Sequence, residues 1–199
     1  MKICVFCSSS NAVDDRYFNA ADKLGLMIAQ NKHTLVYGGA NVGLMEHVAK
    51  TVSKNKAKII GVIPQKIYDK VLASSFPDEM IITHTMDERK RKMRDMSDAF
   101  IALPGGFGTL EEILEVITLK QLDYHRKPIV FINTNNFYGH LIQQFENSYT
   151  ELFAKEHYRK IYAIVNSPED AIDYINKYKH HELDENKWFN VPEKQHKDK

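Results

Sequence analysis

The stretch AFIALPGGFGTLEE, residues 99–112, passes from an apolar run through three glycines into a helical pattern. A strand, a loop and a helix in this order form the basic unit of a parallel sheet covered by helices. An apolar run such as 99–104 is typical of a strand buried on both faces. Because open parallel sheets bind ligands where strands end and helices begin, the stretch predicts an α/β fold with a site at the glycine loop.

Six further short runs rich in β-branched and apolar residues repeat the strand pattern, at 2–7, 34–38, 58–63, 79–84, 128–133 and 161–165. Two longer segments between them, 14–31 and 136–153, carry apolar residues at helical spacing. The apolar faces comprise Tyr17, Ala21, Leu24 and Ile28 in the first, and Phe137, Leu141, Phe145 and Tyr149 in the second. Ser167 and Pro168 are typical of a helix start. We therefore expect a mostly parallel sheet of about seven strands with helices on both faces.

Because the sequence shows no repeat and no internal linker, we expect one domain over residues 1–179, followed by a polar tail over 180–199 in which the periodicity is lost. A formal net charge of +1 provides no overall field for a nucleic acid or an anionic membrane. With no signal peptide and no apolar stretch of about 18 residues, we expect a cytoplasmic protein. In the tail, His180, His181 and Glu182 resemble metal ligands only superficially, and we expect no metal. Cys4 and Cys7 are expected to be buried thiols on opposite faces of a strand.

The glycine loop is the main candidate binding site. Gly105, Gly106 and Gly108 allow a ligand to approach the backbone closely, and a helix start with the Thr109 hydroxyl favours an anion. The nucleotide P-loop ending Gly-Lys-Ser/Thr is absent. The alternative is a tight turn with a capping box between Thr109 and Glu112. We favour the phosphate site because capping does not explain three glycines in four positions.

Two other loops also follow predicted strands, CSSSN (7–11) and YGGANVGLM (37–45). They are expected to converge with the glycine loop on one crevice. The run MDERKRKM (86–93) predicts a helix that is cationic on most of its exposed surface. Most of these charges are expected to be solvated. No aromatic residues alternate with them, so nucleic-acid binding is not expected.

The pairing of PGGFGTLEE with the upstream MDERKRKM resembles the Lonely Guy (LOG) family of cytokinin riboside 5′-monophosphate phosphoribohydrolases, which are often mislabelled as lysine decarboxylases. The resemblance extends over residues 2–178. Further matching segments are GGANVGLM (38–45), GVIP (61–64) and EVITLKQLDYHRKPI (115–129).

The resemblance implies a modified Rossmann fold, a cytosolic dimer and no cofactor. It places the catalytic arginine on Arg89 and the catalytic glutamate on Glu112. The implied substrate-binding residues are Ser9, Gly39, Lys90, Gly105, Gly106, Gly108, Thr109 and Glu111, and a share for Glu115 stays open. A glutamate on the substrate side after GVIP is missing, with Val71 at the ungapped position and Asp69 as a shifted substitute.

The expected reaction is hydrolysis of the N-glycosidic bond of AMP or isopentenyladenosine monophosphate to the free base and ribose 5-phosphate. A carboxylate suits the oxocarbenium-like transition state, or it activates water. The alternative is a non-catalytic carrier of a nucleotide or of the molybdenum cofactor. Lysine decarboxylation is excluded because no constellation for pyridoxal phosphate is found. Leu119, Leu122 and Tyr124 either form part of a subunit contact or pack against their own sheet.

Overall fold

A computed structural model describes residues 1–70 and 72–180. All seven expected strands are present in one sheet, mostly a residue or two shorter than expected. They are β1 (Lys2–Phe6), β2 (Thr34–Tyr37), β3 (Ile59–Pro64), β4 (Glu79–Thr83), β5 (Ala99–Ala102), β6 (Ile129–Ile132) and β7 (Ala163–Val165). The helices are α1 (Asp15–Gln30), α2 (Gly43–Lys54), α3 (Gln65–Tyr68), α4 (Met86–Met96), α5 (Phe107–Gln121), α6 (Gly139–Thr150) and α7 (Pro168–Lys177), with the 3-10 helices η1 (Thr134–Asn136) and η2 (Glu156–Ile161).

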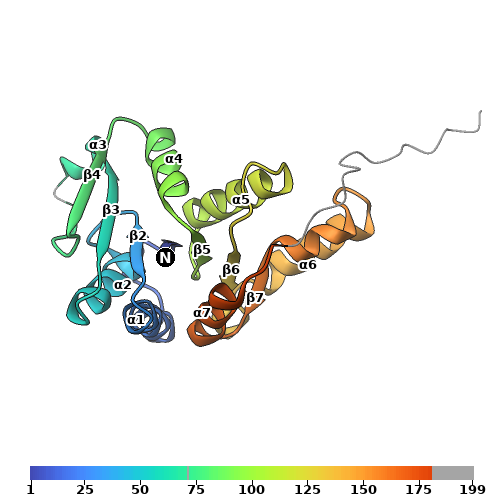
Figure 1. The fold of residues 1–199 in the computed structure, drawn as a ribbon, viewed down its shortest axis with the longest axis horizontal. Coiled ribbons are helices and arrows are strands. Elements are labelled where there is room, and N and C mark those ends of the chain that lie inside the picture. Colours follow the sequence, from blue (N-terminus) through green and yellow to red (C-terminus); the bar gives the residue numbers. More distant parts are fainter. Residues whose placement is uncertain (71, 181–199) are drawn as a thin grey trace, which may run out of the picture.

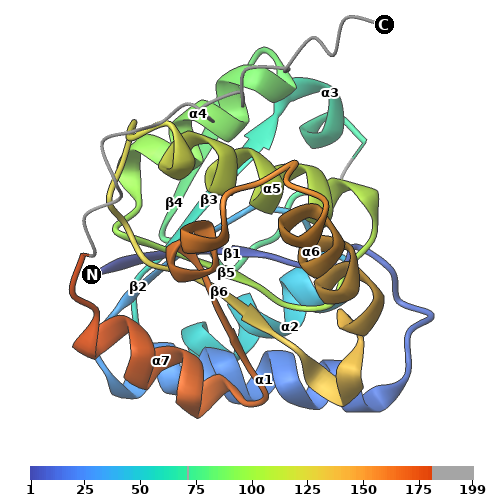
Figure 2. The same ribbon diagram turned by 90° about the vertical axis from the view of Figure 1, so that its right-hand side faces the viewer.

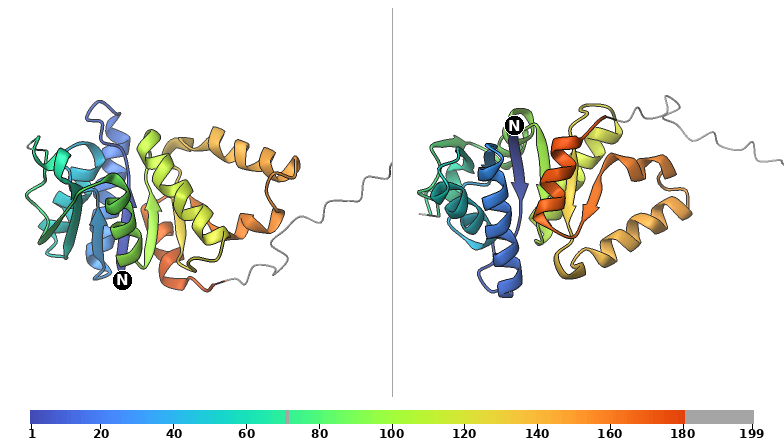
Figure 3. Two further views of the ribbon diagram at one scale, coloured as in Figure 1. Left: turned by 90° about the horizontal axis from the view of Figure 1, so that it is seen from above. Right: turned by 60° about the horizontal axis from the view of Figure 1, so that its bottom comes forward.

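The strands are ordered β4-β3-β2-β1-β5-β6-β7, and every neighbouring pair is parallel. The chain builds outward from β1 to β4 and then returns to the other side of β1 with β5, as both views of Figure 3 show. This reversal creates a switch point between β1 and β5, where the connections leave in opposite directions. Ligands bind at such a point in open α/β sheets. The glycine loop follows β5 directly and therefore lies there.

Helices cover both faces of the sheet (Figures 1 and 2). Helices α1, α2 and α7 pack on one face, where Leu24, Val48 and Ile172 join the core. Helices α4, α5 and α6 lie on the other face, where Met93 and Ile113 belong to a second core cluster. The α/β architecture expected from the alternating runs is confirmed. Because both faces are covered, β1, β2, β3, β5 and β6 could be almost wholly apolar.

Local patterns placed most elements correctly. In α1, Ala21, Leu24 and Ile28 are fully buried, and Ser167 caps α7 by accepting a hydrogen bond from Asp170 N at 3.2 Å. The second amphipathic segment was extended too far toward its start. Asn135 and Asn136 adopt positive φ angles, so α6 begins only at Gly139 and Phe137 lies in the preceding turn.

The cysteines lie as expected from strand geometry. Cys4 packs in the core on the α5 face and Cys7 in the core on the α1 face. Both are buried free thiols. Within the described residues the sheet and its helices extend from Lys2 to Lys177, whereas positions 181–199 of the expected tail lie outside them.

Candidate active site

Arg89 on α4 and Glu112 on α5 form a buried ion pair. Arg89 Nη1 lies 2.7 Å from Glu112 Oε1, and each side chain is only 10% exposed. Helix α4 is started by Thr85, whose Oγ1 accepts a hydrogen bond from Glu88 N at 3.1 Å. The Glu88 carboxylate in turn accepts one from His84 N at 2.9 Å. This cap fixes the first turn of α4 and so helps to place Arg89, which follows it.

Two further contacts fix the guanidinium of Arg89. Its Nε donates a hydrogen bond to the carbonyl oxygen of Val62 in β3 at 3.1 Å. Gly38, at the end of β2, leaves space for the guanidinium, because a Cβ at that position would overlap Arg89 and lie 2.9 Å from the sulfur of Met45. An arginine carries five N–H donors. The two bonds to Glu112 and Val62 leave donors that a substrate oxygen can use.

The carboxyl group of Glu112 has an unusual environment. Burial raises its pKa above the ordinary glutamate value, and the nearby guanidinium of Arg89 lowers it only in part. A carboxylate with a raised pKa is a stronger base than an exposed glutamate. The neighbouring thiols of Cys4 and Cys7 are neutral, because burial raises the pKa of each.

The three glycines of the 105–108 loop have different roles. Gly105 is buried, and a Cβ there would overlap the side chain of Thr109 and lie 3.0 Å from Ser8 N. Gly106 and Gly108 are exposed, and a Cβ at either would have no neighbour within 4 Å. Gly105 therefore permits the packing of the loop, while Gly106 and Gly108 leave open space at the start of α5. At these two exposed positions a ligand can approach the backbone without meeting a neighbouring side chain.

The capping-box alternative is wrong. The N-cap of α5 is Gly106, with no side-chain cap, so Thr109 lies inside the first turn and Glu112 faces Arg89. The first amide groups of a helix have no partner within the helix. Without a side-chain cap they present their hydrogen-bond donors and a partial positive charge to an anion. The start of α5 therefore presents backbone donors of the kind that bind a phosphate.

The three expected loops converge as predicted. Ser8 N donates to Pro104 O at 3.2 Å, and Leu44 N donates to Ser8 O at 2.9 Å. Asn11 completes the join by accepting a hydrogen bond from Gly43 N at 2.7 Å. Gly43 has a φ of 57°, and a Cβ there would lie 2.5 Å from Ser8 O. The first loop thus contacts both others at the switch point.

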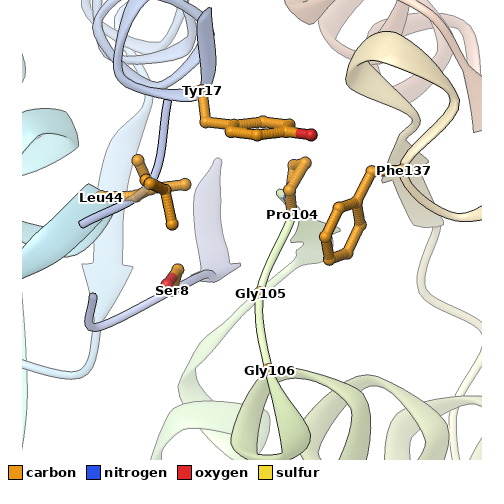
Figure 4. Close-up of a pocket in the computed structure, with 8 residues that line it drawn as sticks. Ser8, Tyr17, Leu44, Pro104, Gly105, Gly106 and Phe137 are labelled. Carbon is orange, nitrogen blue, oxygen red and sulfur yellow. The ribbon is translucent and has the colours of Figure 1, made fainter. Parts of the chain in front are cut away.

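A cavity of about 230 Å³ opens beside the glycine loop (Figure 4). Tyr17 and Phe137 lie on either side of Pro104 in this view, and Gly105 and Gly106 run below toward α5. The lining residues are Ser8, Val13, Tyr17, Leu44, Pro104, Gly105, Gly106 and Phe137. The walls are mostly apolar, so this hollow suits an uncharged group rather than the phosphate itself.

The remaining predicted substrate-binding residues differ in how close they lie to the Arg89–Glu112 pair. Lys90 contacts Glu111 across α4 and α5, so both lie beside Arg89 and Glu112. Ser9 is exposed on the first loop. Gly39 is buried with a φ of 72°, and a Cβ there would lie 3.3 Å from Ile63 Cβ. The structure therefore gives Gly39 a packing role against β3 and does not bring it to the cavity.

The charged run of 86–93 is less solvated than expected. Arg89 is only 8% exposed, and the side chain of Lys90 is 14% exposed, because both face α5. Arg91 and Lys92 are exposed, as predicted for the run as a whole. Helical periodicity places neighbouring residues on different faces, so one run supplies both a buried site and a solvated surface.

The remaining expectations concern the segment after β3, metals and membranes. The Asp69 carboxylate accepts a hydrogen bond from Gln65 Nε2 at 2.6 Å, whereas Val71 lies outside the described residues, as do His181 and Glu182 of the metal hypothesis. Residues 1–70 and 72–180 contain no cluster of three or more His, Cys, Asp or Glu suited to a metal. Every helix in the same ranges is too short or too polar to cross a membrane.

Comparison with known proteins identifies the family. Residues 45–175 match the family model described as "Possible lysine decarboxylase". Cytokinin riboside 5′-monophosphate phosphoribohydrolase LOG5 of Arabidopsis thaliana is 36% identical over 178 residues, which cover 89% of this chain and 78% of that protein. The chain belongs to the LOG family. Two further LOG proteins show the same relationship. LOG2 of A. thaliana is 39% identical, and the match covers 84% of this chain and 78% of LOG2. The probable phosphoribohydrolase LOGL1 of Oryza sativa subsp. japonica is 41% identical, and the match covers 84% of this chain and 74% of LOGL1.

Solved structures resemble this LOG-family chain in fold. The molybdenum cofactor binding protein from Rippkaea orientalis has a TM-score of 0.66 at 26% identity, covering 88% of this chain and 94% of that one. The Moco carrier protein from Chlamydomonas reinhardtii has a TM-score of 0.68 at 22% identity, covering 88% and 95%. The fold therefore accommodates proteins whose names describe carriers as well as those named as hydrolases, and the site must distinguish them.

Sequence reasoning missed several residues around the site. Val62 and Gly38 were noted only as parts of motifs, although they hold the guanidinium of Arg89 in place. Phe137 was expected on a core-facing helix but lines the cavity instead. Nothing in the sequence marked Arg94 as a residue near the site, yet it faces α5 beside Lys90. Only the tertiary contacts identify these residues.

Proposed function

We propose that this LOG-family protein hydrolyses the N-glycosidic bond of a nucleoside 5′-monophosphate such as AMP or isopentenyladenosine monophosphate. The observation that carries the proposal is the buried Arg89–Glu112 pair beside an uncapped, glycine-lined helix start. The phosphate would bind the first amides of α5 near Gly106 and Gly108, with Thr109 contributing its hydroxyl. Glu112 lies one turn further along the same helix. A ribose attached to that phosphate would then reach the pair.

The residues fit the chemistry of the reaction. Cleavage breaks the bond between C1′ and the base nitrogen, and water supplies the oxygen that bonds to C1′. Glu112 stabilises the positive charge that develops on the sugar or accepts the proton of the attacking water. That proton balances the one taken up by the departing base. Arg89 holds the carboxylate in place and presents its remaining donors to the sugar or the phosphate.

The phosphate is expected to contribute to the rate as well as to affinity. Binding energy from a group remote from the reacting bond orients the reacting centre. A free nucleoside lacks this anchor and should be a much poorer substrate. Lys90 and Glu111, which lie beside the pair, and Ser9 on the first loop complete the proposed substrate-binding set, whereas the buried position of Gly39 supports a structural role.

The direct test is to incubate the protein with AMP, isopentenyladenosine monophosphate and adenosine and to quantify the released base by chromatography. Base and ribose 5-phosphate should form in equal amounts from the monophosphates. Arg89→Ala and Glu112→Ala should abolish release. Glu146→Gln, which alters an ion pair with Arg159 on α6 and η2, is the matched control. It should leave the rate unchanged.

The carrier hypothesis makes a different prediction for the same samples. If the wild-type protein releases no base but a nucleotide or the molybdenum cofactor raises its melting temperature, a binding protein is favoured over an enzyme. Retention of both Arg89 and Glu112 supports hydrolysis, since a carrier has no need for a basic carboxylate at the sugar.

We also propose that the protein is a cytoplasmic homodimer. Leu122 is 49% exposed and Tyr124 is 76% exposed, so the alternative that these two pack against their own sheet does not hold. Their position after α5 supports a contact with a second copy. Sedimentation velocity of the wild type and of Tyr124→Lys tests this proposal. A monomeric wild type would contradict it.

A further inference from the structure

A second layer of charges lies next to the Arg89–Glu112 pair. Lys90 and Arg94 are four residues apart on α4 and therefore share one face of that helix. Arg94 Nη1 lies 2.7 Å from Glu115 Oε2, and Lys90 Nζ lies 3.5 Å from the same oxygen. One carboxylate on α5 thus bridges two cations on α4. Figure 1 shows α4 and α5 as neighbours above the sheet.

This bridge is more protected than an ordinary surface ion pair. The side chains of Lys90 and Arg94 are 14% and 19% exposed, and that of Glu115 is 31% exposed. Partial burial reduces the screening of charges by water and salt. Lys90 is also hydrogen-bonded to Glu111, and that contact raises the pKa of Lys90. Lys90 therefore stays charged at neutral pH.

We propose that Glu115 is a positioning residue, which holds Lys90 and Arg94 so that α4 keeps the guanidinium of Arg89 on Glu112. The inference rests on the proposed function and adds a residue to its machinery. Arg89 directly precedes Lys90, so a shift of α4 at Lys90 moves Arg89 as well. Thr85 fixes the start of α4, and Glu115 fixes the following turns from the side of α5.

Positioning matters here because a reacting site tolerates only small displacements of its catalytic groups. A misplacement of about 1 Å can reduce a rate by about 10²-fold. The only hydrogen bonds of Arg89 within the described residues that involve its side chain are those to Glu112 and Val62. The bond to Glu112 opposes sliding of α4 along α5 only at the reacting pair itself, and the bond to Val62 joins α4 to β3. The Glu115 bridge joins the two helices at points one turn apart and opposes that motion.

Two variants distinguish positioning from a simple effect of charge. Glu115→Gln removes a negative charge near the site, and Arg94→Gln removes a positive one, but both break the same contact. If the contact positions Arg89, both variants lower kcat by roughly tenfold, within the range expected for misplacement. KM for AMP should change less than twofold, because the glycine loop supplies most of the phosphate binding.

The titration of Glu112 gives a readout that a merely structural role would not change. The charged and titratable groups facing it are Arg89 and Lys90 from α4, Glu111 from its own helix, and the neutral thiols of Cys4 and Cys7. A loosened Arg89 raises the pKa of Glu112 in both variants. A charge effect alone would lower that pKa in Glu115→Gln and raise it in Arg94→Gln.

The experiment measures kcat and KM for AMP, the melting temperature, and the Glu112 carboxyl titration by carbon-13 NMR on the intact protein. Glu146→Gln is the control, because its side chain is 44% exposed and it pairs with Arg159 away from the site. Lower kcat with a raised Glu112 pKa in both variants supports the proposal. Opposite pKa shifts, or a kcat within twofold of the wild type, overturn it. If the wild type releases no base, the proposed function fails, and the titration alone decides the positioning role.

Discussion

Arg89 Nη1 and Glu112 Oε1 are 2.7 Å apart, although the residues belong to different helices and are both almost fully buried. A buried ion pair adds little to stability by itself, but loss of one partner leaves an unpaired buried charge that costs about 3–5 kcal/mol. The pair is therefore better explained by function than by stability. The neighbouring glycine loop and the family relationship agree with that explanation.

The first prediction concerns the pH dependence of stability. The folded-state pKa of Glu112 is raised above 4.5 by burial. Its stabilising contribution is therefore complete below pH 4.5 and is lost as the pH rises through the folded-state value. Glutamine does not titrate. The free energy of unfolding of Glu112→Gln, relative to the wild type, should increase from pH 4 to pH 7 in urea titrations. A constant or decreasing difference would contradict the assignment.

The second prediction separates the roles of the loop glycines. Gly108→Ala places a methyl group in open space within the first turn of α5. Alanine favours a helix over glycine by about 1 kcal/mol, so the melting temperature should rise by about 2–4 °C. The same methyl group obstructs the proposed phosphate site, and KM for AMP should rise at least tenfold. Thermal denaturation and steady-state kinetics measure both effects.

Gly105→Ala provides the comparison for that experiment. A Cβ at Gly105 would overlap Thr109, so this variant should melt at a lower temperature than the wild type. A Gly108→Ala protein with unchanged KM would show that the phosphate does not bind at this helix start.

The third prediction concerns Lys120, which is 3% exposed. Its ammonium group lies 4.8 Å from the ring centre of Tyr178. Burial lowers its pKa to about 8. A lysine with a lowered folded-state pKa destabilises the fold increasingly as the pH falls from the ordinary value of 10.5 toward about 8, and the full effect is present below that. Lys120→Met should therefore stabilise the protein more at pH 7 than at pH 10, by up to about 3 kcal/mol. Urea unfolding at the two pH values tests this, and equal effects would exclude it.

The fourth prediction concerns the two thiols. Burial raises the pKa of both Cys4 and Cys7, and only the thiolate is nucleophilic. Neither should react with a thiol reagent at pH 8 in the native protein, and both should react in urea. Rapid stoichiometric labelling without denaturant would contradict the assignment of both as buried, neutral thiols.

Much of the fold follows from local sequence patterns. The seven apolar runs predicted the strands because strands buried on both faces need apolar residues at almost every position. The period of 3.6 residues predicted α1 and its buried face. The predicted boundaries of helices were wrong where the conformation of a few residues decides the path of the backbone. Asn135 and Asn136 adopt left-handed conformations, and this delays the start of α6 and turns Phe137 toward the cavity.

The resemblance to the LOG family pointed to Arg89 and Glu112, whereas the sequence by itself determined the order of strands and helices along the chain and the glycine-lined helix start. These features depend on periodicity, chain connectivity and the small size of glycine. Only the tertiary structure decided that Arg89 leaves the solvated face of its helix, that Gly39 packs against β3, and that Glu115 bridges two cations. Such contacts join residues far apart in the chain, and they form because the sheet order sets α4 beside α5.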